Sequence, residues 1–364
     1  MKKFFYVALA ATLLSAGCQK TEIINQVGDS ISFSSEMGKL TKAGTNDLTS
    51  LKAQSFSVWA YYAGDDKNTA GDDTHKVYDE IANVCVSFGT NDKWGTTEQY
   101  YWPGVAKELI FFAVSADAAT IGQTTFATDG TETSTSKVTI NEDRTALTIN
   151  DFVVDPESPN VDLMVADIVQ QHQGDKVVDL SFHHTLAKVE FMFKTITNDD
   201  NLTVTVKSLE VGGIKTTGTF STVERTQTKA DETTGDQPTG DQPETPAYSG
   251  VQTPVGFFWY PEGEGETFSV KKDGAPADFI LDDDYETYSS WMVIPQSIAT
   301  TTVTVKYTIG DKEFESIFDL FTNTLTEWKS NQYVAYRITL APNLITFNPS
   351  VEDWEEVKNV DSIN

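Results

Sequence analysis

The dominant pattern of this chain is an alternation of apolar and polar residues with a period of two. It runs through 56–61, 202–206 and 303–307, where apolar or aromatic side chains alternate with small, polar or charged ones. Alternation places every second side chain on one face of a sheet, so each run predicts a half-buried strand. No window shows a long stripe with helical spacing. The sequence therefore predicts an all-β fold built from β-sandwiches.

The N-terminus departs from this pattern. Two lysines precede an apolar run, 4–16, that is too short to cross a bilayer as a stable helix, and small residues then lead to Cys18. This order is typical of a bacterial lipoprotein signal peptide, in which the cysteine sulfur is acylated and the chain is cut before it. An ordinary signal peptide that contains a cysteine is the alternative. We expect a signal peptide over 1–17, lipidation at Cys18 and a polar tether over 18–30.

Polar segments divide the remainder of the chain. The turn-like stretch 170–175 predicts a boundary between an N-terminal β-sandwich domain, 31–174, and a C-terminal one, 175–357. Residues 226–249 contain a Gly-Asp-Gln-Pro near-repeat with almost nothing to bury, which predicts a disordered insertion in the second domain. The last residues, 358–364, are expected to form a tail.

Charge and cysteine content narrow the classes of partner. The formal net charge is −28 at pH 7, which argues against nucleic acid and against direct docking on anionic lipid. It suits solubility outside the cell. After Cys18 only Cys85 remains, so no disulfide within the chain is expected. Cys85 lies in an apolar strand-like run, and we expect it to be a buried small hydrophobe rather than a nucleophile.

Residues that could carry chemistry are few. The four histidines lack metal-ligand spacing, and no phosphate-binding loop or nucleophile elbow is present. A glycosidase-type carboxylate pair stays open among the many acidic residues, because the sequence singles none out. His183 and His184 are neighbours on a predicted strand, so one points inward, and a hydrogen-bonded buried histidine is expected rather than a ligand. We therefore predict no catalytic residue, metal or cofactor, and no enzyme.

Several segments of this chain resemble segments of one known family, and they occur in the same order along the chain. They are Asp-Leu-Met-Val-Ala at 162–166, the strand 178–189 with His184, the Ile-Pro-Gln strand at 291–296, the Trp-to-Tyr turn at 328–333, and the closing segments 345–347 and 351–354. Together they resemble the fimbrillin family of Bacteroidetes lipoproteins, the pilins of type V fimbriae. Asn331 stands where that family has Gly, and both residues tolerate positive φ.

The resemblance implies a two-domain β-sandwich of transthyretin-like type, exported as a lipoprotein to the outer membrane and cell surface. It implies assembly with other pilin subunits by strand exchange, after a processing protease cuts past a basic residue. Here that residue is Lys42, followed by Ala43. Family members often have Arg at the cut, and an Arg-specific protease does not cut at Lys42. A host or bacterial surface receptor is a further implied partner.

Strand exchange also has a physical basis in the sequence. A sandwich that loses an edge strand exposes unpaired backbone and an apolar groove, and a neighbour's strand restores both. We expect the first strand to fill such a groove with Ile31 and Phe33. The C-terminal segment offers Ile345, Phe347 and Val351 as donor-strand candidates. The rival outcome is a C-terminal segment that stays in its own domain, as in a tip or accessory subunit.

A different class of function is the alternative. A surface-anchored lipoprotein that binds glycans would stack sugar rings on exposed aromatic side chains, for which Trp59, Trp94 and Trp102 are candidates. The run 100–103 is equally typical of a strand that ends in the core. Fibres in electron micrographs would favour the fimbrial subunit, and retention of glycan by a monomer would favour the glycan-binding lipoprotein.

Overall fold

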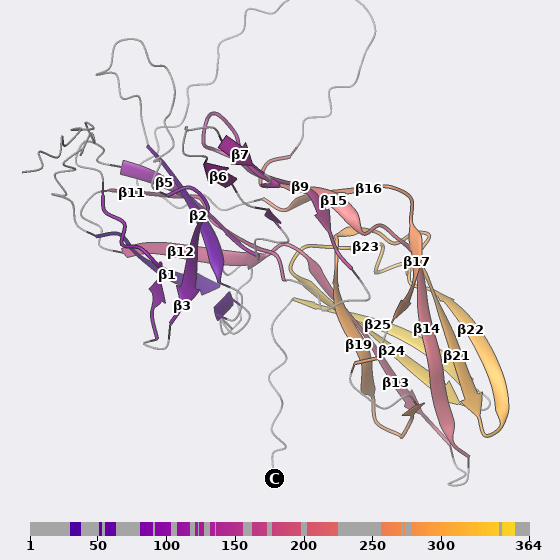
Figure 1. The fold of residues 1–364 in the computed structure, drawn as a ribbon. Helices are drawn as coiled ribbons and strands as arrows, with labels where there is room; N and C mark the ends of the chain where they lie inside the picture. Colours follow the sequence, from indigo (N-terminus) through magenta and orange to yellow (C-terminus); the bar gives the residue numbers. More distant parts are fainter. Residues whose placement is uncertain are drawn as a thin grey trace, which may run out of the picture.

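The computed structural model describes most of the chain between residues 30 and 353. The described ranges are 30–37, 51–52, 55–62, 81–89, 92–102, 108–116, 121–122, 124–126, 132–134, 136–155, 162–172, 177–197, 202–224, 256–270, 272–273, 278–341 and 344–353. Their regular structure is dominated by strands, labelled up to β25, which confirms the all-β prediction (Figure 1). Within these ranges there is no helix that is both long enough and apolar enough to span a membrane.

The largest sheet has eight strands and lies in the N-terminal half. Its order is β1-β12-β10-β5-β2-β3-β4, and β11 also pairs with β5. The strands are β1 (Ser32–Met37), β2 (Phe56–Tyr62), β3 (Val84–Phe88), β4 (Trp94–Gly95), β5 (Glu108–Ser115), β10 (Met164–Ala166), β11 (Val169–His172) and β12 (Val177–His184). β5 is buried along nearly its whole length because both faces carry a core: Phe111 enters one and Phe112 the other.

A smaller sheet covers one face of the large one. It has the order β16-β15-β9-β8, formed by Phe258–Glu262, Thr217–Ser221, Leu147–Val153 and Val138–Ile140. Its Ile149, Phe152 and Phe220 join Phe112 in one buried cluster. A separate two-stranded hairpin is formed by β6 (Thr124–Phe126) and β7 (Glu132–Ser134).

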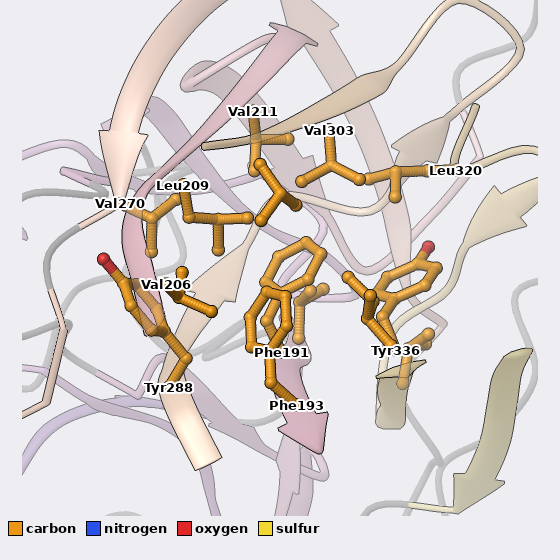
Figure 2. Close-up of a cluster of buried hydrophobic side chains, with 14 of the residues drawn as sticks. Phe191, Phe193, Val206, Leu209, Val211, Val270, Tyr288, Val303, Leu320 and Tyr336 are labelled. Atoms are coloured by element: carbon orange, nitrogen blue, oxygen red, sulfur yellow. The ribbon is translucent and has the colours of Figure 1, made fainter. Parts of the chain in front are cut away.

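The C-terminal half is a β-sandwich. One sheet has the order β19-β13-β24-β25, formed by Glu286–Val293, Ala187–Thr195, Gln332–Ala341 and Leu344–Asp353. The facing sheet has the order β17-β14-β21-β22, formed by Glu266–Val270, Val204–Ile214, Thr302–Ile309 and Lys312–Asp319, with β18 (Phe279–Ile280) also on β14. Phe191, Phe193 and Tyr336 fill the space between them (Figure 2). β20 (Gln296–Ser297) pairs with β23 (Glu327–Trp328) outside both sheets.

Strand pairing crosses the expected boundary between residues 174 and 175. β12 follows that boundary yet pairs with β1 and β10, and β15 pairs with β9. Hydrogen-bonded sheets therefore connect the two expected domains, 31–174 and 175–357.

The passage from β14 to β15 carries the chain from the sandwich to the smaller sheet. Gly213 adopts φ of 82°, and a Cβ at this position would lie 2.7 Å from the Thr300 carbonyl oxygen, so the bulge requires glycine. Gln296 then holds the turn: its Oε1 accepts from the Lys215 N–H and its Nε2 donates to the Lys215 carbonyl, each at 2.9 Å. These two hydrogen bonds explain why the Ile-Pro-Gln segment ends in a glutamine.

One expectation is wrong, and several lie outside the described residues. Cys85 is exposed, because Val86 takes the core-facing position of β3 and the next residue back points to the other face. The signal peptide, the tether up to residue 29, the insertion 226–249 and the tail 358–364 are outside the described residues, as are Cys18, Lys42 and Ala43.

Candidate strand-exchange site

The first strand, β1, lies at the end of the eight-stranded sheet and is anchored by two apolar side chains. It pairs in parallel with β12, from Ser32 opposite Val177 to Met37 opposite Phe182. Ile31 and Phe33 are each 7% exposed, whereas Ser32 between them faces solvent. The expectation that Ile31 and Phe33 fill apolar pockets is confirmed.

The pocket that receives Phe33 is aromatic. Its ring meets Phe56 and Phe111 edge-on, with ring centroids 6.5 and 6.3 Å apart. Its walls come from β2, β5 and the core face of β12, where Val178, Leu180 and Phe182 are fully buried. Removal of β1 would therefore expose both the backbone edge of β12 and an apolar groove.

Polar contacts just before β1 and at its middle help to fix its register. The Ile31 N–H donates to the Tyr100 carbonyl oxygen at 2.8 Å, and Ser30 forms a bridge with Tyr101. The Ser34 hydroxyl donates to the Asp179 carboxylate. Over its described side chains, 31–35, the strand is thus held by two buried apolar residues, together with one ladder and a few polar contacts, a set that an equivalent strand can reproduce.

The C-terminal strand, β25, is the second edge of interest. It pairs antiparallel with β24 over ten residue pairs, from Leu344 opposite Ala341 to Asp353 opposite Gln332. Directly opposite residues share a face, and the partners of the three donor candidates are buried in the sandwich core: Leu340, Ile338 and Val334. Ile345 and Val351 nevertheless stay 39% and 42% exposed, because they lie at the open side of the sandwich.

Phe347 is the donor candidate that packs on the core. Its ring stacks on Tyr336 and on Phe318, with centroids 5.4 Å apart in both pairs. Tyr336 is fixed in place, because its hydroxyl accepts a hydrogen bond from Trp328 Nε1 at 2.9 Å. Burial raises the pKa of Tyr336 well above its usual value. In this structure β25 is therefore folded into its own sandwich, and its donation to another subunit stays a prediction.

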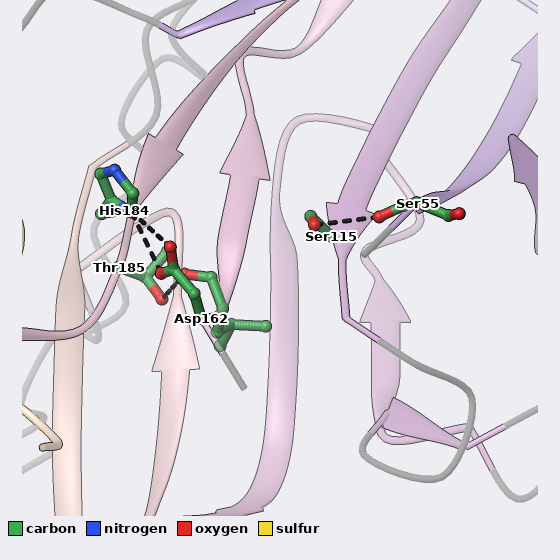
Figure 3. Close-up of polar contacts among 6 residues, drawn as sticks. Ser55, Ser115, Asp162, His184 and Thr185 are labelled. Atoms are coloured by element: carbon green, nitrogen blue, oxygen red, sulfur yellow. Dashed lines mark hydrogen bonds and ion pairs between the residues drawn. The ribbon is translucent and has the colours of Figure 1, made fainter. Parts of the chain in front are cut away.

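Two histidine–carboxylate pairs fasten the strand next to β12. His184 Nδ1 lies 2.9 Å from a carboxylate oxygen of Asp162, and His183 Nε2 lies 3.0 Å from Asp167 Oδ1 (Figure 3 shows the first pair). The Thr185 hydroxyl donates to the Leu163 carbonyl at 2.8 Å. Because neighbouring strand residues face opposite sides, the two pairs lock β10 to β12 from both faces of the sheet.

These pairs give both histidines a structural role, which is to hold the aspartates that flank β10. His183 is 5% exposed and hydrogen-bonded, as expected for a buried structural histidine. Within the described ranges no three metal-ligating side chains converge. Sequence reasoning noted the Asp162 and His184 segments separately but missed their contact. The signal was a pair of aspartates flanking one short strand and a pair of adjacent histidines ending the next.

The aromatic side chains proposed for glycan stacking do not form an exposed platform. Trp59 and Trp102 are 5% and 2% exposed. Trp94 is half-buried and packs on Phe56 and Phe88, with ring centroids 4.8 and 5.2 Å apart. The expectation of exposed rings is wrong for Trp59 and Trp102, whose side chains are turned into the core, and Trp94 is partly covered by its two aromatic neighbours.

The turn before β24 links the two halves. Asn331 adopts φ of 58°, as its substitution for Gly requires, and its N–H donates to the Leu186 carbonyl at 3.0 Å. Trp328 at the start of this turn is buried. The turn thus docks on the link between β12, which receives β1, and β13 in the sandwich.

Comparisons with known proteins identify a matching family and similar solved structures. Residues 41–354 match the family model described as fimbrillin-like. A fimbrial protein from Bacteroides vulgatus ATCC 8482 is 15% identical, with a TM-score of 0.54 over 90% of this chain and 99% of that one. A fimbrial assembly protein from Parabacteroides distasonis ATCC 8503 is 11% identical, with a TM-score of 0.37 over 90% and 99%. No curated protein matches.

The structural likeness at 15% sequence identity supports the fold alone, and family membership rests on the family model. The range that this family model matches, 41–354, covers most of the described chain, including the walls of the groove that holds β1, the histidine pairs and β24 with β25. The resemblance inferred from the sequence is confirmed, and the chain belongs to the fimbrillin-like family.

Proposed function

We propose that this protein is a fimbrial subunit that is exported as a lipoprotein through Cys18, held at the outer membrane, and joined to other pilin subunits by strand exchange. Family membership and the all-β fold support a fimbrial role at the cell surface. The observation that carries the proposal is the attachment of β1: a terminal strand anchored in an apolar groove by Ile31 and Phe33.

Release of β1 would follow cleavage after Lys42. The cut separates β1 from the rest of the chain covalently but leaves it seated on β12. An incoming strand must then offer backbone groups to β12 and two apolar side chains at i and i+2. Ile345 and Phe347 have this spacing, and each side chain that becomes buried contributes about 1.5–3 kcal/mol.

The test is Lys42→Ala, with Lys39→Ala as the matched control. We expect Lys42→Ala to abolish trimming and leave monomers with an unchanged β spectrum by circular dichroism, while the control assembles normally. The mature N-terminus, read by sequencing, should be Ala43 in the control. Normal fibre yield from untrimmed Lys42→Ala protein, seen by electron microscopy, would refute the mechanism.

Export through Cys18 has its own test. Cys18→Ala should leave the chain unprocessed or mislocalised, because the predicted acyl acceptor is lost. Metabolic labelling with a radioactive fatty acid should mark the wild-type chain and not the variant. A variant that matures and fractionates with outer membranes as before would overturn the lipoprotein proposal.

A second candidate is a tip or accessory subunit that accepts a strand but donates none. The ten-pair ladder between β24 and β25 favours it, because donation must break this ladder first. Deletion of residues 344–364 discriminates the two roles. A stalk subunit lacking β25 should terminate fibres, whereas an accessory subunit should still be incorporated at a fibre end at normal frequency.

A further inference from the structure

A continuous stack of five aromatic rings crosses the C-terminal sandwich. It runs from Trp291 to Phe191 (5.3 Å, 20°), Tyr336 (5.2 Å, 18°), Phe347 (5.4 Å, 17°) and Phe318 (5.4 Å, 11°), where each pair of values gives the centroid distance and interplanar angle to the preceding ring. The first four rings come one from each strand of the sheet β19-β13-β24-β25. The fifth comes from β22, which ends the facing sheet.

One end of this stack is fixed and the other lies at the open side of the sandwich. Phe191 and Tyr336 are fully buried and point into the core (Figure 2), and Trp291 is 5% exposed. Phe347 and Phe318 are only partly buried, and each belongs to a strand at the end of its sheet. Phe347 is thus a ring of an edge strand inserted between Tyr336 of its own sheet and Phe318 of the other.

The remaining side chains of β25 hold it less firmly. Ile345 and Val351 face the core side but stay about two-fifths exposed. On the outer face the Arg337 guanidinium donates to the Ser350 hydroxyl at 2.6 Å. Closure of the sandwich around β25 therefore depends on whether Phe318 covers Phe347.

We propose that Phe318 is a latch that keeps β25 in its own sandwich, and that its contact with Phe347 sets how often the strand opens. The latch concerns the regulation of the strand exchange proposed above and rests on that function for its biological meaning. Its physical action is independent of assembly. When Phe318 turns away, Phe347 keeps one stacked neighbour instead of two, and β25 is left with its ladder to β24.

Phe314 provides a matched control on the same strand. It lies on the same side of β22 as Phe318 but is 40% exposed, and it also stacks flat on a ring, that of Tyr307 at 5.5 Å and 17°. Tyr307 belongs to β21, so this stack joins two strands of one sheet and does not bridge to β25. Phe318→Ala and Phe314→Ala therefore remove the same chemical group from the same strand with and without the contact to Phe347.

Hydrogen exchange of the purified full chain, followed by mass spectrometry, tests the latch. We expect Phe318→Ala to speed exchange of the amides of 344–353 by about tenfold relative to Phe314→Ala, because one flat ring contact is lost in the closed state. Amides of β13 should exchange at the same rate in both variants. Phe318→Leu, which keeps most of the volume, guards against misfolding and should show an intermediate rate, and Phe318→Tyr should restore the wild-type rate.

Two outcomes would overturn the latch: equal exchange of 344–353 in Phe318→Ala and Phe314→Ala, or a uniform acceleration across the whole sandwich. Fibre growth of the same variants separates the latch from the function. If 344–353 open faster and fibres grow faster, both proposals are supported. If 344–353 open faster while fibre growth is unchanged, the latch stands and donation of β25 is refuted.

Discussion

Phe33→Ala is the most direct probe of the groove that β1 occupies. The side chain is 7% exposed and meets two rings edge-on, Phe56 and Phe111. Truncation of a buried Phe costs about 3–5 kcal/mol. The two edge-to-face contacts account for about 0.5–1.5 kcal/mol each of that total. Because β1 ends its sheet, water can enter the vacated pocket, so we expect a loss near the lower limit, about 3 kcal/mol.

The loss should appear first as undocking of β1 rather than as global unfolding. β1 pairs with β12, so the amides of 177–184 should exchange faster, while those of the C-terminal sandwich keep their protection. Urea denaturation gives the total free energy of unfolding. Ile31→Val, which removes one methyl group from the neighbouring pocket, should cost about 0.5–1.5 kcal/mol.

Ser32→Ala is the matched control, since Ser32 lies on the same strand but is exposed. It should change the free energy of unfolding by less than about 0.5 kcal/mol. If Phe33→Ala costs no more than Ser32→Ala, or if exchange at 177–184 is unchanged, Phe33 does not anchor β1 and the groove does not select its strand through this pocket.

Three further predictions concern other parts of the chain. Because burial raises the pKa of Tyr336 above its usual value near 10, the folded state keeps a proton that the unfolded state releases, so stability is full below about pH 10 and falls above it. Tyr336→Phe should reduce this loss in urea titrations at high pH, at a cost of about 0.5–1.5 kcal/mol for the hydrogen bond from Trp328. Asp162→Ala removes the carboxylate beside His184 and should cost about 1–3 kcal/mol in urea denaturation. Deletion of 226–249 should shift the melting temperature by only a few degrees, because loop shortening has a small entropic effect.

Controls sharpen these three tests. Tyr288 also has a pKa raised by burial, so some loss of stability at high pH should survive in Tyr336→Phe, and an unchanged loss would contradict the role of Tyr336. Asp283→Ala removes an exposed aspartate and should be nearly neutral; an equal cost for Asp162→Ala would show that its histidine contact adds nothing. A large drop in melting temperature on deletion of 226–249 would show that this segment packs.

The sequence by itself determined the class of fold and the character of individual strands. A period of two predicts the strands that the structure has at 56–61 and 303–307, and in 31–34 it places Ile31 and Phe33 together on one apolar face. Asn331 in place of Gly predicts the positive φ that the turn adopts. These features are local, because they depend on backbone sterics and on which side of a strand a residue takes.

The tertiary structure decided everything that joins distant residues. Period-two patterning does not say which face is covered, so Cys85 is exposed while Trp59 and Trp102 are buried. It does not say which strands become neighbours, so pairing across residue 174 was not predicted. The stack that ends with Phe347 on Phe318 depends on both choices, because two rings meet face to face only after each sheet has its strand order and the sheets have closed on one another.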